Sequence, residues 1–146
     1  MKTDKLKVIG TGAIRVDELD KITGAAQYVD DLEFGENLLY AEIIESPYAH
    51  ARIVSIDASE AEKVPGVVAV VTGADFPYKF GLYMKDRHIF AQQETRFVGE
   101  QVAGVVARSM RIAKRAAKLV KIKYEELTPV LNQTDAFKNT KNLVHP

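Results

Sequence analysis

The side chains best suited to chemistry in this 146-residue chain are three histidines, two pairs of identical adjacent acids and a serine close to a histidine. Histidines spaced a few residues apart would indicate a metal site, but His50, His88 and His145 have no such spacing. Ser46 precedes His50, yet the sequence places no acid nearby to complete a hydrolase triad. The sequence therefore predicts isolated surface histidines, with no catalytic and no metal-binding residue in this chain.

The two pairs of identical acids are Asp30-Asp31 and Glu125-Glu126. Adjacent residues point in different directions, so neither pair is arranged as a general acid and base, and both are predicted to be solvated. The glycines of Gly10-Thr11-Gly12 are spaced as in a dinucleotide-binding loop. However, Arg15 occupies the third glycine position, and residues 16–24 are too polar and too short for the crossover helix. We therefore predict a turn and no cofactor-binding residue.

A basic stripe without an intervening acid extends over residues 108–123, and it consists of Arg108, Arg111, Lys114, Arg115, Lys118, Lys121 and Lys123. Such a stripe is suited to nucleic acid or to an acidic partner subunit. Twenty basic and twenty acidic side chains balance over the chain, and no aromatic side chain within the stripe offers base stacking. We favour a solvated helix face or a subunit contact and predict no nucleic-acid partner.

The stripe lies in the best-patterned part of the chain, which reads as strand, helix and strand between residues 97 and 127. Residues 101–107 form an apolar run typical of a strand covered on both faces. Ser109 is a suitable N-cap for a helix that begins at about Met110 and has one apolar and one basic face. From Val120 onward the apolar residues alternate with lysines, as in a half-buried strand.

A second unit of the same kind is predicted over residues 51–72, with a short helix for which Asp57 and Glu60 form a capping box. A further strand is predicted over residues 38–45. Strand-helix-strand units normally join parallel strands by right-handed crossovers. The predicted fold is therefore α+β, with a mixed sheet of about five or six strands that contains two βαβ units, and with two main helices.

Residues 73–95 lack a regular pattern and carry five aromatic side chains: Phe76, Tyr78, Phe80, Tyr83 and Phe90. Two interpretations remain open, because these rings either fill the domain's own core or face a partner domain. The absence of cysteine excludes disulfides and iron–sulfur ligation by this chain. No secretory signal or membrane-spanning stretch is present in the sequence, so we expect a cytoplasmic protein with no membrane partner.

Three ordered blocks of residues extend over nearly the whole chain. The first is Arg15-x-Asp17 with Lys21-x-Thr23-Gly24-x-Ala26-x-Tyr28-x-Asp30-Asp31; the second is Leu39-Tyr40-Ala41 with Ser46-Pro47-Tyr48-Ala49-His50-Ala51-Arg52-Ile53 and Pro65-Gly66-Val67; the third is Val98-Gly99-Glu100-x-Val102-Ala103 with Tyr124-Glu125 and Leu127-x-Pro129-Val130. Together they resemble the a/b hammerhead domain, the first domain of the molybdenum hydroxylase large subunit in the xanthine dehydrogenase and aldehyde oxidase family.

The resemblance implies an N-terminal scaffold domain of a molybdopterin-dependent hydroxylase, which oxidises an aldehyde or an N-heteroaromatic substrate with oxygen from water. In that family the molybdopterin contacts lie in downstream domains, and iron–sulfur and flavin sites belong to other domains or subunits. This chain alone is therefore expected to hold no cofactor and to be inactive. Its expected partners are the downstream molybdopterin-binding domains or subunit and the iron–sulfur and flavin subunits.

The expected organisation has three parts: an N-terminal extension at residues 1–11, the hammerhead domain at 12–131, and an extended linker toward a missing downstream domain at 132–146. Two alternatives to a domain fragment remain open. The chain is a separate subunit that assembles with a cofactor-binding subunit, or it is a stand-alone binding module with the same fold and no enzyme activity.

Overall fold

The computed structural model describes residues 10, 12, 14–32, 34–141 and 143, and the chain divides into two compact units, Met1–Asn37 and Leu38–Pro146. In the first unit, helix α1 (Glu18–Thr23) ends at Gly24, whose φ of 75° is readily adopted by glycine, and the 3₁₀ turn η1 (Val29–Asp31) follows. Neither element contains a buried residue. The first unit therefore has local structure but no apolar core around these elements.

Residues of the first sequence block hold this local structure. Asp17 accepts hydrogen bonds from Lys21 at 2.5 Å and from the Arg15 guanidinium at 3.0 Å. The Lys21 ammonium, and after it the Arg15 guanidinium, lowers the pKa of Asp17 below its ordinary value. The backbone N–H of Tyr28 donates to Asp31 at 2.9 Å. The spacing of these residues is thus explained by short-range polar contacts.

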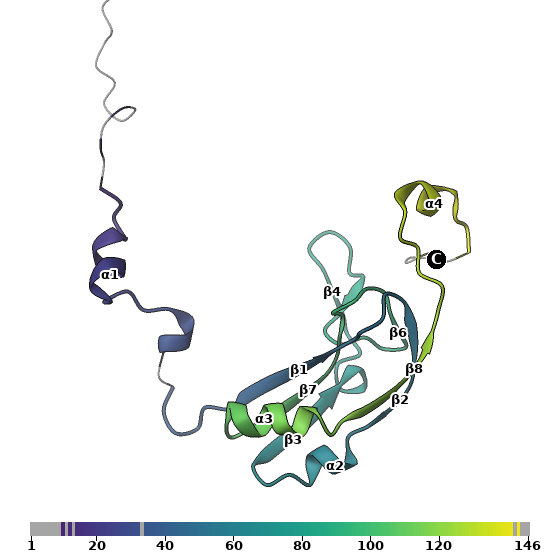
Figure 1. The fold of residues 1–146 in the computed structure, drawn as a ribbon, viewed down its shortest axis with the longest axis horizontal. Helices are drawn as coiled ribbons and strands as arrows, with labels where there is room; N and C mark the ends of the chain where they lie inside the picture. The colour runs from purple at the N-terminus through teal and green to yellow at the C-terminus, as the bar shows by residue number, and fades with distance from the viewer. Residues whose placement is uncertain (1–9, 11, 13, 33, 142, 144–146) are drawn as a thin grey trace, which may run out of the picture. The chain divides into compact units, whose positions relative to one another are not determined.

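The second unit contains most of the regular structure (Figure 1). Its elements in chain order are β1 (Tyr40–Glu45), β2 (Ala51–Asp57), α2 (Ser59–Glu62), β3 (Val67–Thr72), η2 (Gly73–Asp75), β4 (Lys79–Phe80), β5 (Arg87–His88), β6 (Glu94–Thr95), β7 (Gln101–Ala107), α3 (Met110–Ala117), β8 (Lys121–Glu126) and α4 (Gln133–Lys138). The strands form a β7 sheet with the order β1-β7-β3, a β2 sheet with the order β6-β2-β8, and a β4–β5 hairpin.

The apolar core lies between the β7 sheet and the helices α2 and α3. Helix α3 packs against all three strands of this sheet (Figure 1). Ala61 of α2, Val105 of β7 and Ala116 of α3 form a fully buried cluster. Small alanines at the helix positions let the helices approach the sheet closely, while Val105 fills the space between them. The predicted strand over residues 101–107, covered on both faces, is confirmed.

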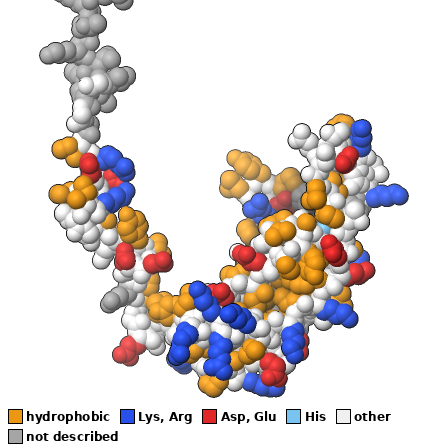
Figure 2. Space-filling model, in the orientation of Figure 1, with side chains coloured by type: hydrophobic (Ala, Val, Ile, Leu, Met, Phe, Trp, Pro, Cys, Tyr) orange, Lys and Arg blue, Asp and Glu red, His pale blue; other side chains and the backbone are white. Residues whose placement is uncertain are grey.

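The start of α3 also follows the prediction. Ser109 has an extended backbone, and its hydroxyl accepts a hydrogen bond from the N–H of Ile112 at 3.3 Å. Ala113 and Ala116 face the core, whereas the basic side chains are exposed. Figure 2 shows Lys and Arg side chains gathered over α3. The predicted α+β class is confirmed.

The predicted parallel pairing is wrong, because all strand pairs among the described residues are antiparallel. β7 has β1 and β3 on its two edges, so β8 finds no free edge there and pairs with β2. In the same way, α2 carries the chain from β2 in one sheet to β3 in the other. Each strand-helix-strand unit therefore bridges two sheets, and the single mixed sheet is replaced by two three-stranded sheets and a hairpin.

The predicted capping box of α2 is also wrong. The Asp57 side chain accepts from the N–H of Ser59 at 3.0 Å, while Ala58 is the N-cap residue and provides no side-chain cap. Glu60 instead pairs with Lys63 at 2.7 Å. Because α2 has only four residues, it forms few helical hydrogen bonds that a capping box could stabilise.

The aromatic segment at residues 73–95 divides between the two interpretations. Phe90 is buried, and its ring centroid lies 6.0 Å from that of Phe76, so these rings fill the domain's own core. In contrast, Tyr78, Phe80 and Tyr83 are exposed, on or beside the β4–β5 hairpin. Within the part of the chain that the structure describes, no helix has the length and apolar character needed to cross a membrane.

Candidate functional site

The second and third sequence blocks meet at one end of the second unit. The N–H of Ser46 donates to the carbonyl of Glu100 at 2.9 Å, and the N–H of Gly99 donates to the carbonyl of Ser46 at 2.8 Å. The N–H of Leu127 donates to the carbonyl of His50 at 2.9 Å. These bonds join residues 46–50, 94–100 and 127–131 into one site, which we call the block junction.

A tight turn at Phe97–Glu100 forms the centre of the block junction. The N–H of Glu100 donates to the carbonyl of Phe97 at 3.3 Å, and Gly99 has a φ of 89°. A type II turn requires this conformation at its third position, where glycine is free of strain. The Glu100 carboxylate accepts from the N–H of Arg96 and closes the turn. The Val98-Gly99-Glu100 signature, to which the sequence assigned no chemical role, thus has a structural one.

A buried pair of hydroxyls holds the block junction together. Ser46 is 2% exposed and Thr95 is fully buried, and their hydroxyl oxygens lie 3.1 Å apart. The Ser46 hydroxyl also accepts from the N–H of Tyr48 at 3.1 Å, and the Thr95 hydroxyl donates to the carbonyl of Ala51 at 3.4 Å. Both hydroxyls are engaged in fixing backbone, so Ser46 is not placed as a nucleophile. Sequence reasoning missed Thr95, because a lone threonine carries no pattern.

Charged side chains form a network along one side of the block junction. The Nδ1 of His50 lies 3.1 Å from the carbonyl of Thr128, and since a carbonyl only accepts, Nδ1 carries the proton. The Nε2 of His50 lies 3.7 Å from Glu94. Arg52 lies 2.7 Å from Glu125 through Nη1 and 3.9 Å from Glu94 through Nε. Arg52 thus forms cross-strand ion pairs, and the imidazole of His50 lies beside the carboxylate of Glu94.

The histidine prediction needs correction at this point. His50 is not an isolated surface residue, because it lies in this network with its side chain only 22% exposed. His88, on β5, has a buried Nδ1 without a hydrogen-bond partner among the described residues. His145 lies outside the described residues. Glu125 is exposed to solvent as predicted, with 55% of its side chain accessible, and it also pairs with Arg52.

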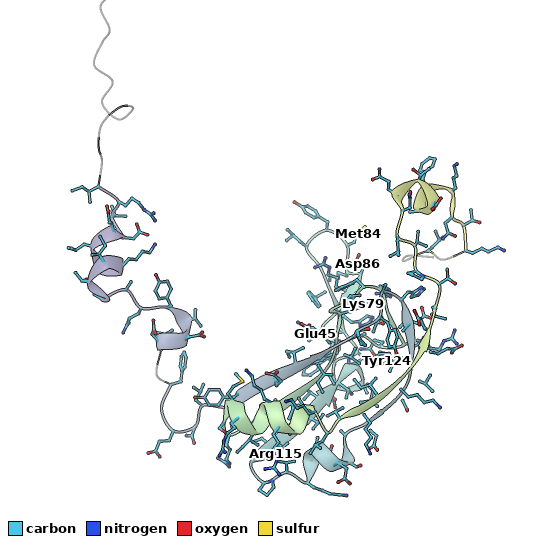
Figure 3. All side chains as sticks on the ribbon, viewed as in Figure 1. Glu45, Lys79, Met84, Asp86, Arg115 and Tyr124 are labelled. Atoms are coloured by element: carbon cyan, nitrogen blue, oxygen red, sulfur yellow. The ribbon has the colours of Figure 1, made fainter. Side chains whose placement is uncertain are left out.

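Two tyrosines pack below the block junction. The rings of Tyr48 and Tyr124 have centroids 5.2 Å apart and are tilted by 57°. The Tyr124 hydroxyl is buried and finds no partner among the described residues. Burial, and after it the proximity of Tyr48, raises the pKa of Tyr124 above its ordinary value. Tyr124 on β8 is labelled in Figure 3. A phenol that stays neutral in this way is suited to a packing role for the Tyr124 ring.

Two grooves lie on either side of the turn. The first has a volume of about 470 Å³, and its lining includes His50, Glu94, Phe97, Val98, Val130 and Leu131. The second has a volume of about 600 Å³ and lies between the turn and the β4–β5 hairpin, with Phe80, Arg87, Ile89, Arg96 and Phe97 in its lining. Phe97 and Val98 remain 57% and 65% exposed at the turn. Apolar side chains thus project from a turn whose polar groups are satisfied.

The residues of the block junction do not fit a molybdopterin cofactor. An anionic pterin phosphate is bound by free backbone N–H groups or by a cluster of cations. The amides of Arg96, Gly99 and Glu100 already donate to acceptors within the chain, and the carboxylate of Glu94 lines the first groove. Within residues 10–141 as far as they are described, no group of three or more His, Asp or Glu side chains is placed to hold a metal ion.

Comparison with known proteins connects this geometry to a family. Residues 23–128 match the family described as aldehyde oxidase and xanthine dehydrogenase, a/b hammerhead domain. The chain is 38% identical over 130 residues to the xanthine dehydrogenase/oxidase of Gallus gallus, which covers 88% of this chain and 10% of that protein. It is 33% identical over 141 residues to the nicotinate dehydrogenase large molybdopterin subunit of Eubacterium barkeri, which covers 95% of this chain and 33% of that subunit.

Solved structures give the same result. The quinoline 2-oxidoreductase of Pseudomonas putida 86 superposes with a TM-score of 0.81 and 39% sequence identity, over 94% of this chain and 19% of that chain. The Cu,Mo-CO dehydrogenase superposes with a TM-score of 0.80 and 33% identity, over 87% of this chain and 16% of that chain. The chain therefore spans a small part of the proteins to which it is similar, between 10% and 33% of the two curated relatives.

Proposed function

The chain belongs to the aldehyde oxidase and xanthine dehydrogenase family through its a/b hammerhead domain, and on that premise we propose that it is the non-catalytic scaffold portion of a molybdenum hydroxylase. The complete enzyme oxidises an aldehyde or an N-heteroaromatic substrate with oxygen from water. The molybdopterin centre is carried by downstream domains or by a separate subunit. The relatives named nicotinate dehydrogenase large molybdopterin subunit and quinoline 2-oxidoreductase support an N-heteroaromatic substrate.

One observation supports a scaffold role most directly. At the block junction the hydroxyls of Ser46 and Thr95 and the backbone amides of the turn are engaged within the chain, whereas Phe97, Val98 and Leu131 are 57%, 65% and 83% exposed. A surface whose hydrogen-bonding groups already have partners within the chain, and whose apolar side chains are exposed, is suited to packing against another protein surface. We propose that the cofactor-bearing domains cover this surface.

The remaining organisation follows from the same proposal. Residues 1–11 form an extension, residues 12–131 the hammerhead domain, and residues 132–146 a linker toward the cofactor-bearing part. Iron–sulfur and flavin groups belong to other domains or subunits, and the assembled enzyme works in the cytoplasm. The chain itself contributes no catalytic, cofactor-binding or metal-binding residue.

The test compares the purified 146-residue chain with the complete assembly from the same cells. We expect molybdenum in the assembly and none in the chain by elemental mass spectrometry, and dye-coupled oxidation of aldehydes or N-heteroaromatics only by the assembly. The assembly is the positive control for cofactor supply. Stoichiometric molybdenum in the chain alone would refute the division of roles. Failure of the chain to associate with any molybdopterin-bearing polypeptide would favour a stand-alone binding module.

A further inference from the structure

The groove between the β4–β5 hairpin and the Phe97–Glu100 turn has features of a specific protein-binding site. We infer that this hairpin groove, lined by Phe80, Arg87, Ile89, Arg96 and Phe97, binds a segment of a partner polypeptide in which a carboxylate lies between apolar side chains. The inference rests on the proposed function, because the partner is taken to be another domain or subunit of the enzyme. It adds the place of contact and the chemistry of the contacting segment.

The first argument concerns unpaired cations. Arg87 and Arg96 are exposed, and neither guanidinium forms an ion pair with a described residue, whereas Arg15 and Arg52 do. The two acids in the same lining are already engaged: Glu100 accepts from the N–H of Arg96, and Asp86 has an interaction of its own. A carboxylate from outside the chain that enters the groove can therefore pair with a guanidinium group of its lining without displacing an internal acid.

The hairpin adds further positive charge and fixes the orientation of one arginine. Lys79 and Lys85 add positive charge to the same hairpin, although neither side chain lines the groove. Phe80 and Arg87 are direct cross-strand partners in the hairpin ladder. Directly opposed residues present their side chains on the same face of the ladder. An aromatic ring and a guanidinium are thus offered together on one face of the hairpin. Lys79, Met84 and Asp86 of the hairpin segment are labelled in Figure 3.

The second argument concerns exposed apolar surface. Phe80, Ile89 and Phe97 are 51%, 44% and 57% exposed, and Leu82 and Tyr83 near the hairpin tip are 89% and 95% exposed. Figure 2 shows hydrophobic side chains on the projecting hairpin. Aromatic side chains and arginine are the residue types most enriched where protein interfaces gain their affinity. The occupant therefore carries apolar side chains on both sides of its carboxylate.

The third argument concerns rigidity. One wall of the groove is the turn closed by Gly99 and Glu100 and bonded to Ser46. A surface that is ordered before binding loses little conformational entropy when it binds. The basic face of α3 differs, because its exposed cations line neither of the two grooves beside the turn. That face is the matched control for a nonspecific charge effect.

The experiment uses the complete assembly and a carbodiimide that joins amines to carboxylates at contact distance. The variants R87K and R96K place an amine in the groove and keep its charge, and R111K and R115K do the same on α3. We expect cross-links from positions 87 and 96 to Asp or Glu residues of the molybdopterin-bearing polypeptide. No such cross-link is expected from positions 111 and 115.

A second measurement removes the charge. In the assembly with R87Q and R96Q together, amides of residues 79–89 should exchange with solvent at least about tenfold faster, whereas the pair R111Q and R115Q leaves them unchanged. Circular dichroism of each variant checks that the fold is retained. Unchanged exchange in the groove variant overturns the inference, even when molybdenum content stays normal and the proposed function stands.

The other outcomes are also decisive. Cross-links at positions 87 and 96 in an assembly that contains no molybdenum would support the groove as a binding site and refute the proposed function. Charge-dependent binding to vesicles of phosphatidylcholine and phosphatidylglycerol, lost in the R87Q and R96Q variant, would assign the groove to a lipid surface and overturn the inference. Equal cross-linking from the α3 positions would overturn it as well, because the contact would then be nonspecific.

Discussion

The two three-stranded sheets of the second unit are stabilised by different interactions. In the β7 sheet, Val102 and Val105 of the central strand are fully buried, and α3 covers the sheet. In the β2 sheet, only Ala51 of the central strand is buried, and its strands are connected by ion pairs of Arg52 and by the Thr95 hydroxyl, which donates to the carbonyl of Ala51 and contacts Ser46 just after β1. The sequence blocks that meet at the block junction thus lie beside the β2 sheet, whose central strand has only one buried residue.

This difference shows which part of the domain is complete by itself. The β7 sheet finishes its packing within the chain, so its stability depends on side-chain volume. The β2 sheet depends on polar geometry and leaves apolar groups beside it exposed. We therefore expect substitutions in the β7 sheet to act on the isolated chain, and those at the block junction to act also on assembly.

The largest expected effect is that of Val105→Ala in the β7 sheet. Removing two methyl groups from a fully buried site should lower the free energy of unfolding by about 2 to 3 kcal/mol, measured by urea denaturation. The matched control is Val54→Ala on β2, where the side chain is half exposed, and its cost should stay below about 1 kcal/mol. Equal losses at the two positions would contradict the contrast between the sheets.

A smaller effect is expected for Ser46→Ala at the block junction. The substitution leaves the N–H of Tyr48 without its side-chain acceptor and the buried Thr95 hydroxyl with one partner fewer, at a cost of about 1 to 2 kcal/mol. Thermal unfolding of the chain measures the loss, with Ser55→Ala on the exposed side of β2 as the control. A loss no greater than that of the control would show that the hydroxyl pair does not stabilise this sheet.

Arg52→Gln should have a weaker and salt-dependent effect. Because the side chains of Arg52 and Glu125 are about half exposed, their ion pair is screened by solvent and should contribute less than about 1 kcal/mol. The free energy of unfolding of the variant and of the unsubstituted chain should be compared at low salt and in 1 M salt, a change in ionic strength on the order of tenfold. The variant should be less stable at low salt and equally stable at high salt. A difference that persists in high salt would indicate a packing role for Arg52.

Tyr124→Phe should be close to neutral or slightly stabilising at neutral pH, within about 1 kcal/mol, because the lost hydroxyl is buried without a partner among the described residues. The pKa of Tyr124 is raised above its ordinary value of 10.0, so the folded state favours the neutral phenol. Its contribution to stability is complete below pH 10.0 and is lost as the pH rises through the raised value. Unfolding at pH 8 and at about pH 11 should show a smaller alkaline loss in the variant.

Sequence patterns predicted the elements more successfully than their pairing. The apolar run at residues 101–107 and the cap at Ser109 depend on local physics, and both are confirmed. The pairing partner of β8 depends on which strand edges are already occupied, and this information is distributed over the chain. The order strand, helix, strand along the chain is the same in a parallel βαβ unit and in this antiparallel fold, where the helix connects strands of different sheets. The order of elements alone therefore does not distinguish the two arrangements.

The candidate site shows the same limit. The ordered blocks identified the family, but the sequence alone did not reveal that residues near positions 46, 98 and 128 are joined by hydrogen bonds. Thr95 was missed, because its importance comes from complete burial beside Ser46 and a threonine in sequence carries no sign of that burial. The φ of Gly99 was equally hidden, although a glycine before Glu100 was compatible with a turn.

The interleaving of the two sheets has a consequence for folding. The β7 sheet takes strands from residues 40–45, 67–72 and 101–107, and the β2 sheet takes strands from 51–57, 94–95 and 121–126. Neither sheet can be completed during synthesis until its last strand has left the ribosome. The strands within roughly the first hundred residues therefore have unpaired edges until that point. We expect folding of the second unit to be slow, dominated by long-range contacts, and nearly all-or-none.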